Sequence, residues 1–472
     1  MSATISPSDA VFGRMSPAVP ARSAQDAAVS FADLPEKAPP RSVVRDLPEP
    51  AERELRLQRV LIAYVVAGLF FMLLPGTVLG VWNLISISSR HALDALSPAW
   101  LQAHGHAQIF GWIGTFILGI GFYSLSKMGQ CQSVSISRAW IAFALWITGV
   151  ASHWIAGVTG WHWRILLPGS AALELAGFLI FFRTVSRHRP TGSGSGAKRE
   201  PWMFLVIASS FGFLASLVLN ASAVSKLAWD GVQPALPHVV DQRIVALEVW
   251  CFLIPAIWGF NARWLPVFLG LKAPNGRLLF ASLAAVWISV FSLLFDVLTV
   301  SAILLPLAAG TAVYALQVWR RPVRAPKIAG VHPSFPFFVR AAYAWLLIGA
   351  GLWLAAVFAD RSGGIWGAAR HALTVGYIST MVFAIGQRVL PAFGGARRLY
   401  SSRLMFASLA ALMIGCSLRV ASEIPAYEGY SQSAWHLLPC SAVIELLAVF
   451  LFAANMVMTF LQPPAHLQER PA

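Results

Sequence analysis

The stretch HALTVGYISTMVFAIG (residues 371–386) opens with a histidine and is otherwise almost entirely apolar. A second stretch of the same design, HAQIFGWIGTFILGIG, occupies residues 106–121. Aligned without a gap, the two share seven of sixteen residues, including the leading histidine, two glycines and a threonine. Both lie within longer apolar runs of about 20 residues, the length that a helix needs to cross a membrane. The repeat therefore directs attention to His106 and His371.

The composition of the chain predicts a polytopic membrane protein. Its 472 residues are 57% hydrophobic and only 12% charged, which a soluble domain in contact with water does not need. We expect an all-α fold of twelve transmembrane helices in contact with lipid. The predicted spans are residues 60–86, 102–126, 139–158, 163–183, 202–224, 242–262, 278–299, 302–319, 339–359, 367–391, 403–421 and 434–461.

The basic residues predict the direction of the spans. The loops after even-numbered spans, with the span ends beside them, hold 19 Lys and Arg residues, and the opposite loops and span ends hold seven, Arg419 among them. By the positive-inside rule, both termini are expected in the cytoplasm. This distribution accounts for the net charge of +15, so we exclude nucleic acid as a partner. We expect a disordered cytoplasmic tail at residues 1–57, the membrane domain at 58–462 and a short cytoplasmic tail at 463–472.

A second repeated motif indicates an internal repeat of four helices. The motif R-x-L-P-x-F ends span 6 at residues 263–268 and span 10 at residues 388–393. Spans 2, 6 and 10 are four apart, which predicts three four-helix units with equivalent second helices. The alternative is twelve helices of similar composition that match by chance.

Twelve spans in three units, with histidines on spans 2 and 10, resemble subunit I of the haem–copper oxidases. The segments HALTVGYISTMVFAIGQRVL and HGHAQIFGWIGTF are similar to the NnrS family, bacterial membrane proteins of the nitric-oxide response that carry haem and copper. The resemblance covers about residues 58–462. It implies a pseudo-threefold bundle in the bacterial inner membrane, with haem, copper, and nitric oxide or another small gas as ligand. Span 6 lacks a histidine and spans 7 and 8 lack an adjacent pair, which argues against oxygen reduction.

His106 and His371 are the leading candidates for haem axial ligands. Imidazole suits haem iron, and two histidines at matched depth on different helices can hold one iron from opposite faces. Small residues nearby, such as Gly105, Gly111 and Gly376, leave room for a macrocycle or serve close helix packing. His104 points roughly 160° away from His106 on a helix. It is a further cofactor candidate, either as the axial ligand of span 2 or as a ligand to a second metal, unless it is an interfacial residue.

A second group of side chains predicts copper or a second haem. His104, His153, His162 and His436 are the candidates, and together with His106 and His371 they complete the set of metal-ligand histidines. The alternative is that these histidines belong to the membrane interface. Four acids, Glu174, Glu248, Asp296 and Glu445, are expected inside spans, where an unpaired carboxyl group is costly. Glu248 is the candidate proton relay; its alternative role is to cap a broken helix.

Three functions fit these features. The first is a haem protein that binds nitric oxide or protects against it; if it is an enzyme, it is a haem-dependent oxidoreductase acting on nitric oxide. The second is a terminal oxidase or nitric oxide reductase of haem–copper type, with an electron donor as partner. The third is a twelve-span secondary transporter. The absence of C-x-x-C-H from the sequence excludes covalent haem and favours haem b.

Overall fold

The computed structural model describes residues 49–92, 96–128, 134–186, 200–396 and 398–462. Twelve helices in this part of the chain are long and apolar enough to cross a membrane, which confirms the predicted number. Residues 1–48 of the expected N-terminal tail and all of the expected C-terminal tail lie outside the described residues. Residues 49–57, also expected in the tail, belong instead to the first helix, α1 (Glu49–Phe71).

Eight of the twelve spans are continuous α-helices, numbered here by span in chain order. Spans 3, 4 and 5 are α5 (Ile136–Thr159), α6 (Trp163–Ser186) and α7 (Pro201–Asp230). Spans 7, 8 and 9 are α10 (Gly276–Leu294), α11 (Leu298–Leu316) and α12 (Phe335–Ala359). Spans 11 and 12 are α15 (Ser402–Tyr427) and α16 (Ala434–Phe460).

The other four spans, 1, 2, 6 and 10, each contain a π-helical segment. Span 1 consists of α1, η1 (Met72–Val78) and α2 (Leu79–Arg90), and span 2 of α3 (Pro98–His106), η3 (Ala107–Gly114) and α4 (Thr115–Met128). Span 6 consists of α8 (His238–Leu247), η4 (Glu248–Leu253) and α9 (Ile254–Phe268). Span 10 consists of α13 (Gly364–His371), η5 (Ala372–Ser379) and α14 (Thr380–Phe393).

The π segments support the internal repeat. When spans 2 and 10 are aligned on their shared histidine, η3 and η5 begin at the same position, directly after that histidine. A π segment widens the helix and is frequent at functional sites. In η1 and η5, and at the residue that follows η3, a hydroxyl group bonds the carbonyl oxygen five residues earlier. Thr77 donates to Met72 at 2.8 Å, Thr115 to Phe110 at 3.3 Å, and Ser379 to Thr374 at 2.8 Å.

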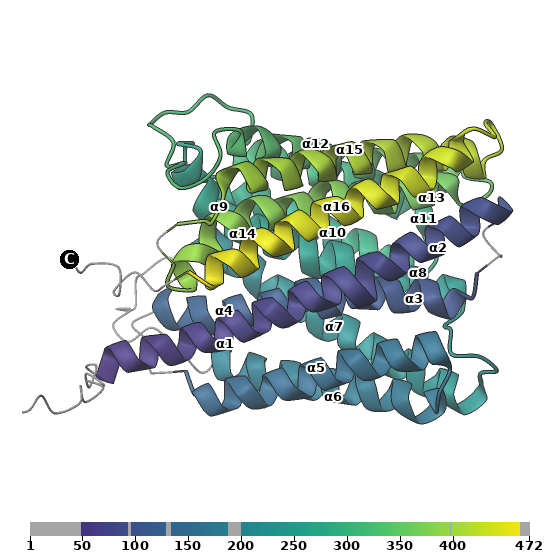
Figure 1. Ribbon diagram of the computed structural model, residues 1–472. Helices are drawn as coiled ribbons and strands as arrows, with labels where there is room; N and C mark the ends of the chain where they lie inside the picture. Colours follow the sequence, from purple (N-terminus) through teal and green to yellow (C-terminus); the bar gives the residue numbers. More distant parts are fainter. Residues whose placement is uncertain (1–48, 93–95, 129–133, 187–199, 397, 463–472) are drawn as a thin grey trace, which may run out of the picture. The chain divides into compact units, whose positions relative to one another are not determined.

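Spans 2, 6 and 10 are the inner helices of a ring-shaped bundle, and span 10 also lies between spans 9 and 11, because α13 and η5 contact both α12 and α15. Among their most apolar residues, 83%, 83% and 56% are buried, compared with 61% in span 1 and at most 44% in the eight continuous helices. Neighbouring four-helix units meet where α6 contacts α7 and where α11 contacts α12, and the ring closes where α16 contacts α2. In Figure 1 the dark α1–α2 helix and the yellow α16 run side by side. The helices that carry the repeat are therefore the central ones.

Two sequence expectations were wrong in detail. The turn between spans 7 and 8 lies at residues 295–297, not near Ser301, which is inside α11. Asp296 sits in that turn with a left-handed backbone (φ 62°), is exposed, and pairs with Arg243, so it is not a membrane acid. The apolar residues on both sides of Asp296 hid the turn. Span 11 also continues past residue 421 to Tyr427, which places Glu423 inside a helix.

A close approach of two helices generates a stability prediction. A Cβ atom at Gly212 of α7 would lie 2.1 Å from the carbonyl oxygen of Cys251 in η4. We expect Gly212→Ala to separate α7 from η4 and to cost about 1–3 kcal/mol, the usual range for overpacking. Thermal unfolding of the detergent-solubilised protein measures this loss. Gly351→Ala in α12, where nothing lies within 4 Å, is the matched control; equal melting temperatures for both variants would contradict the close packing.

Candidate functional site

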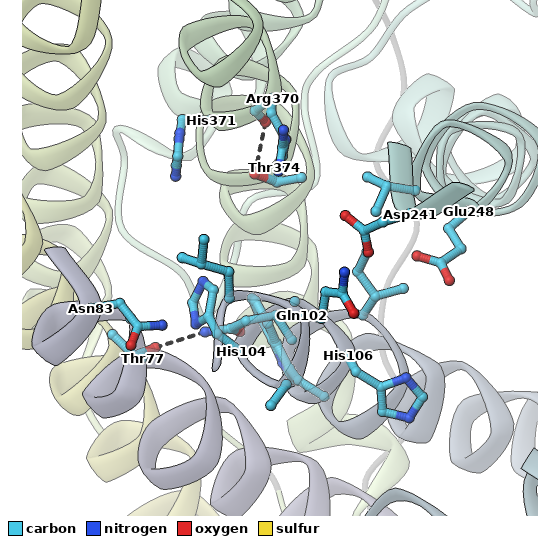
Figure 2. A pocket seen from close by; sticks show the side chains of 18 of the residues that line it. Thr77, Asn83, Gln102, His104, His106, Asp241, Glu248, Arg370, His371 and Thr374 are labelled. Carbon is cyan, nitrogen blue, oxygen red and sulfur yellow. Dashed lines mark hydrogen bonds between the residues drawn. The ribbon is translucent and has the colours of Figure 1, made fainter. Parts of the chain in front are cut away.

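A cavity of about 300 Å³ lies among the central helices, in the half of the bundle where α3, α8 and α13 begin. Spans 1, 2, 6 and 10 contribute to its wall (Figure 2), as do spans 11 and 12. The wall is partly apolar but also carries charged groups, which is unusual within a membrane bundle and makes the cavity the candidate functional site. These groups are Asp241, Glu248, Arg370, Arg419 and Glu445.

His104 projects into this cavity from span 2. Its Nδ1 atom lies 2.9 Å from the carbonyl oxygen of Gly76 in η1. A carbonyl oxygen only accepts, so Nδ1 carries the proton and donates it, and the lone pair of the neutral ring is left on Nε2. This is the form in which histidine binds a metal, because the second nitrogen holds the ring in position.

His371 on span 10 has the same arrangement. Its Nδ1 donates to the carbonyl oxygen of Gly367 at 2.8 Å, and the carboxylate of Glu423 lies 2.9 Å from the same atom. A guanidinium nitrogen of Arg419 lies 3.5 Å from Nε2, as a donor toward its lone pair. In Figure 2, His104 and His371 point toward one another from opposite walls of the cavity. The structure thus brings these two predicted residues together, with the lone pair of each ring on Nε2; that of His371 faces the guanidinium group of Arg419.

His106 points away from His371 and into a different group of side chains (Figure 2). Its Nε2 lies 2.9 Å from Oε1 of Glu174 on α6, and its ring stacks on that of His153 of α5 at 3.6 Å. All three side chains are buried. One ligand atom from each lies within 4.8 Å of those of the other two. The two histidines of span 2 therefore belong to different sites.

Two further metal-ligand candidates lie apart from both sites. His162 is exposed in the turn between α5 and α6, where its ring contacts Trp161. His436 is exposed on α16. Within the described residues, His153 is the only candidate copper ligand whose ring stacks on the ring of another histidine.

Glu248, the candidate proton relay, is 4% exposed and lines the cavity as the first residue of η4. Figure 2 shows its carboxylate beside that of Asp241. Both acids come from span 6, so they occupy the wall that this span contributes. The position fits both predicted roles. Glu248 faces the cavity, as a proton relay would, and it begins a π segment, as the cap of a broken helix would.

The small residues near the histidines divide into two kinds. A Cβ atom at Gly105 would have nothing within 4 Å, and this residue lines the cavity. At Gly111 and Gly376 a Cβ would lie within 3 Å of Phe71 and Trp345, so these glycines serve helix packing. Only the first kind leaves space for a ligand.

The structure adds an ion pair that sequence reasoning missed. Arg419 and Glu423 of α15 are 7% and 2% exposed, and Nε of the arginine lies 3.3 Å from Oε2 of the glutamate. Arg419 had been counted as a loop cation, and Glu423 fell beyond the expected end of span 11. The available signal was the R-x-x-x-E spacing, which puts both charges on one face of a helix. This pair positions His371 through Glu423.

The sequence profile of the family described as NnrS protein matches residues 61–463. The chain belongs to the NnrS family. No curated protein is significantly similar to it in sequence.

Among solved structures, the NnrS-family chain is similar to a haem–copper terminal oxidase dimer determined by cryo-electron microscopy. The TM-score is 0.62 at 13% identity, over 87% of this chain and 85% of the oxidase chain. At this identity the similarity concerns the fold alone. It confirms the expected class, an all-α bundle of twelve transmembrane helices with the architecture of haem–copper oxidase subunit I.

Proposed function

We propose that this NnrS-family protein binds a b-type haem in the cavity, between His104 and His371, and limits the harm done by nitric oxide. The observation that carries the proposal is the shared state of the two imidazoles. Each donates Nδ1–H to a backbone carbonyl oxygen, which leaves the lone pair on Nε2, the atom that would bind a metal; at His371 the metal would take the place of the 3.5 Å contact with Arg419. Haem iron takes two such ligands from opposite faces.

The proposal replaces His106 by His104 as the ligand from span 2. His106 and His371 are equivalent in the sequence repeat, but His106 points away from His371 and its Nε2 faces Glu174. Residues two apart on a helix point roughly 160° from one another, so the two histidines cannot both face His371. Because His104 lines the cavity opposite His371, it is the better axial ligand.

Other residues of the cavity fit a haem. Arg370 and Arg419 line it, and NH1 of Arg419 is buried without a hydrogen-bond partner among the described residues. A guanidinium group that lacks a partner suits a carboxylate such as a haem propionate. Gly105 leaves the wall open where the flat face of a macrocycle needs room. When bound, a haem held by both histidines would supply an iron centre that passes an electron; to take up nitric oxide, it would need one of the two imidazoles to leave the iron.

A respiratory terminal oxidase is a weaker proposal for this chain. Spans 5–8 contain a single histidine, His238, which is exposed at the start of α8. A copper centre of oxidase type beside the haem therefore has no imidazole ligands from this four-helix unit. Transport is also less favoured, because the chain repeats in units of four helices, whereas transporter folds repeat in two halves.

Visible spectra of the purified protein test the haem ligands. We expect His104→Ala and His371→Ala each to abolish or shift the Soret band, because each removes an axial nitrogen. His106→Ala and the exposed control His162→Ala should keep the wild-type band. An unchanged band in His104→Ala, together with loss of the band in His106→Ala, would restore the pairing of His106 with His371.

The proposed location is the bacterial inner membrane, with both termini in the cytoplasm and the cavity in the periplasmic half. The 19-to-seven distribution of cations supports this direction. A reporter enzyme that works only in the cytoplasm should be active when it is fused after Ala472. Activity of a reporter that works only in the periplasm would reverse the orientation.

Growth of a deletion strain tests the proposed role. Cells that lack the protein should grow more slowly than wild type in the presence of a nitric-oxide donor and equally well in its absence. Complementation with the wild-type chain should restore growth, whereas His371→Ala should not. Equal sensitivity of deletion and wild-type cells would refute the role, and rescue by His371→Ala would separate the role from the haem.

A further inference from the structure

We propose that His106, His153 and Glu174 form a site for a divalent first-row transition-metal ion, separate from the proposed haem ligands. The three side chains come from spans 2, 3 and 4, so the site belongs to the first four-helix unit. Two imidazoles and one carboxylate form a common ligand set for zinc, iron and copper ions. The inference does not depend on haem binding.

The spacing of the donor atoms fits a single ion. Bonds of about 2.0–2.2 Å to nitrogen and oxygen hold neighbouring ligand atoms about 3–3.5 Å apart in tetrahedral geometry. Nε2 of His106 and Oε1 of Glu174 are 2.9 Å apart, and the whole set lies within 4.8 Å. Small side-chain rotations therefore bring all three donors to one centre.

A hydrogen bond fixes the ring of His153 in the form that binds metals. The hydroxyl of Ser170 donates to the carbonyl oxygen of Leu167 at 2.7 Å, so its lone pair is available to accept. Nδ1 of His153 lies 3.5 Å from that hydroxyl oxygen, and as the donor in this contact it carries the proton. The lone pair of the neutral imidazole then resides on Nε2. Ser170 thus orients His153 as carbonyl groups orient His104 and His371.

A histidine–glutamate pair alone leaves two features unexplained. Oε2 of Glu174 is buried and has no hydrogen-bond partner among the described residues, and the side chain is fully buried. The rings of His106 and His153 stack face to face at 5°, an arrangement that makes no hydrogen bond between them. A bound cation accounts for both, because it offsets the buried carboxylate charge and draws the two imidazoles to one point.

A glycine makes room for the carboxylate. A Cβ atom at Gly149 of α5 would lie 2.7 Å from Cγ of Glu174. The absence of a side chain at this position lets α6 approach α5 closely enough for Glu174 to reach His106. The contact also holds the glutamate against the helix that carries His153.

The site has a route for its ion and open coordination positions. His106 and His153 both line the cavity, so an ion in the cavity reaches the donors directly. Three protein ligands leave at least one position for water or another small molecule, as in catalytic metal sites. Copper(II) is expected to bind most tightly, since affinity in such sites rises along the divalent series to copper.

Metal binding to the full-length protein in detergent tests the inference. The protein is stripped with a chelator, titrated separately with Cu²⁺ and Zn²⁺, desalted, and analysed for metal content. We expect one equivalent of tightly bound metal in the wild type and in His104→Ala. Glu174→Gln and His153→Ala should bind at least about tenfold more weakly, since even indirect partners of metal ligands cost 10–100-fold. His162→Ala and His436→Ala are matched controls that should keep full binding.

The same samples separate this inference from the haem proposal. Glu174→Gln preserves side-chain shape, and a monodisperse elution profile with the wild-type Soret band shows that it folds. Retention of the metal in both Glu174→Gln and His153→Ala would overturn the site, as would a wild type that binds no more than those variants. Loss of the metal in His104→Ala would also overturn it, because the two sites would then be one. An absent Soret band with the metal retained would refute the haem proposal alone.

Discussion

Backbone carbonyl groups in η1 hold one side chain of span 2 and one of span 3 in place. The widened turn of a π segment presents carbonyl oxygens to neighbouring helices, and such contacts are favourable in a water-poor interior. In span 1 the carbonyl of Pro75 accepts a hydrogen bond from the indole of Trp154 at 3.1 Å, and that of Gly76 accepts one from His104. One break in the first helix thus binds span 3 and orients a candidate ligand on span 2.

The fold was largely predictable from the sequence, whereas side-chain direction within the site was not. Length and apolarity identify each span, and the gapless match between spans 2 and 10 predicted the helices that became central. The same match favoured His106 over His104, because equivalent positions share depth. The direction in which a side chain points, however, depends on the helix opposite it. Span 1 offers His104 a carbonyl oxygen, and no pattern in the sequence of span 2 predicts this contact. Glu423 was missed for a similar reason, since charges made the end of span 11 resemble a loop.

The polar groups of the cavity wall are unevenly distributed over the three four-helix units of the NnrS-family chain. Polar side chains come from all three units, but imidazoles come only from the first and third. The second unit supplies carboxyl groups instead, at Asp241 and Glu248. The internal repeat of the fold therefore does not extend to the side chains that face the cavity.

The first and last spans meet beside the cavity, which has a consequence for biogenesis. Thr77 and Gly80 of span 1 and Ala442 and Glu445 of span 12 line the same wall, and α2 contacts α16. A ribosome delivers these segments at opposite ends of synthesis, so the pocket stays incomplete until the final helix enters the membrane. While the chain is still being synthesised, a large prosthetic group can enter the pocket laterally, through the gap on the side that span 12 later covers. Insertion of span 12 into the membrane then closes this gap.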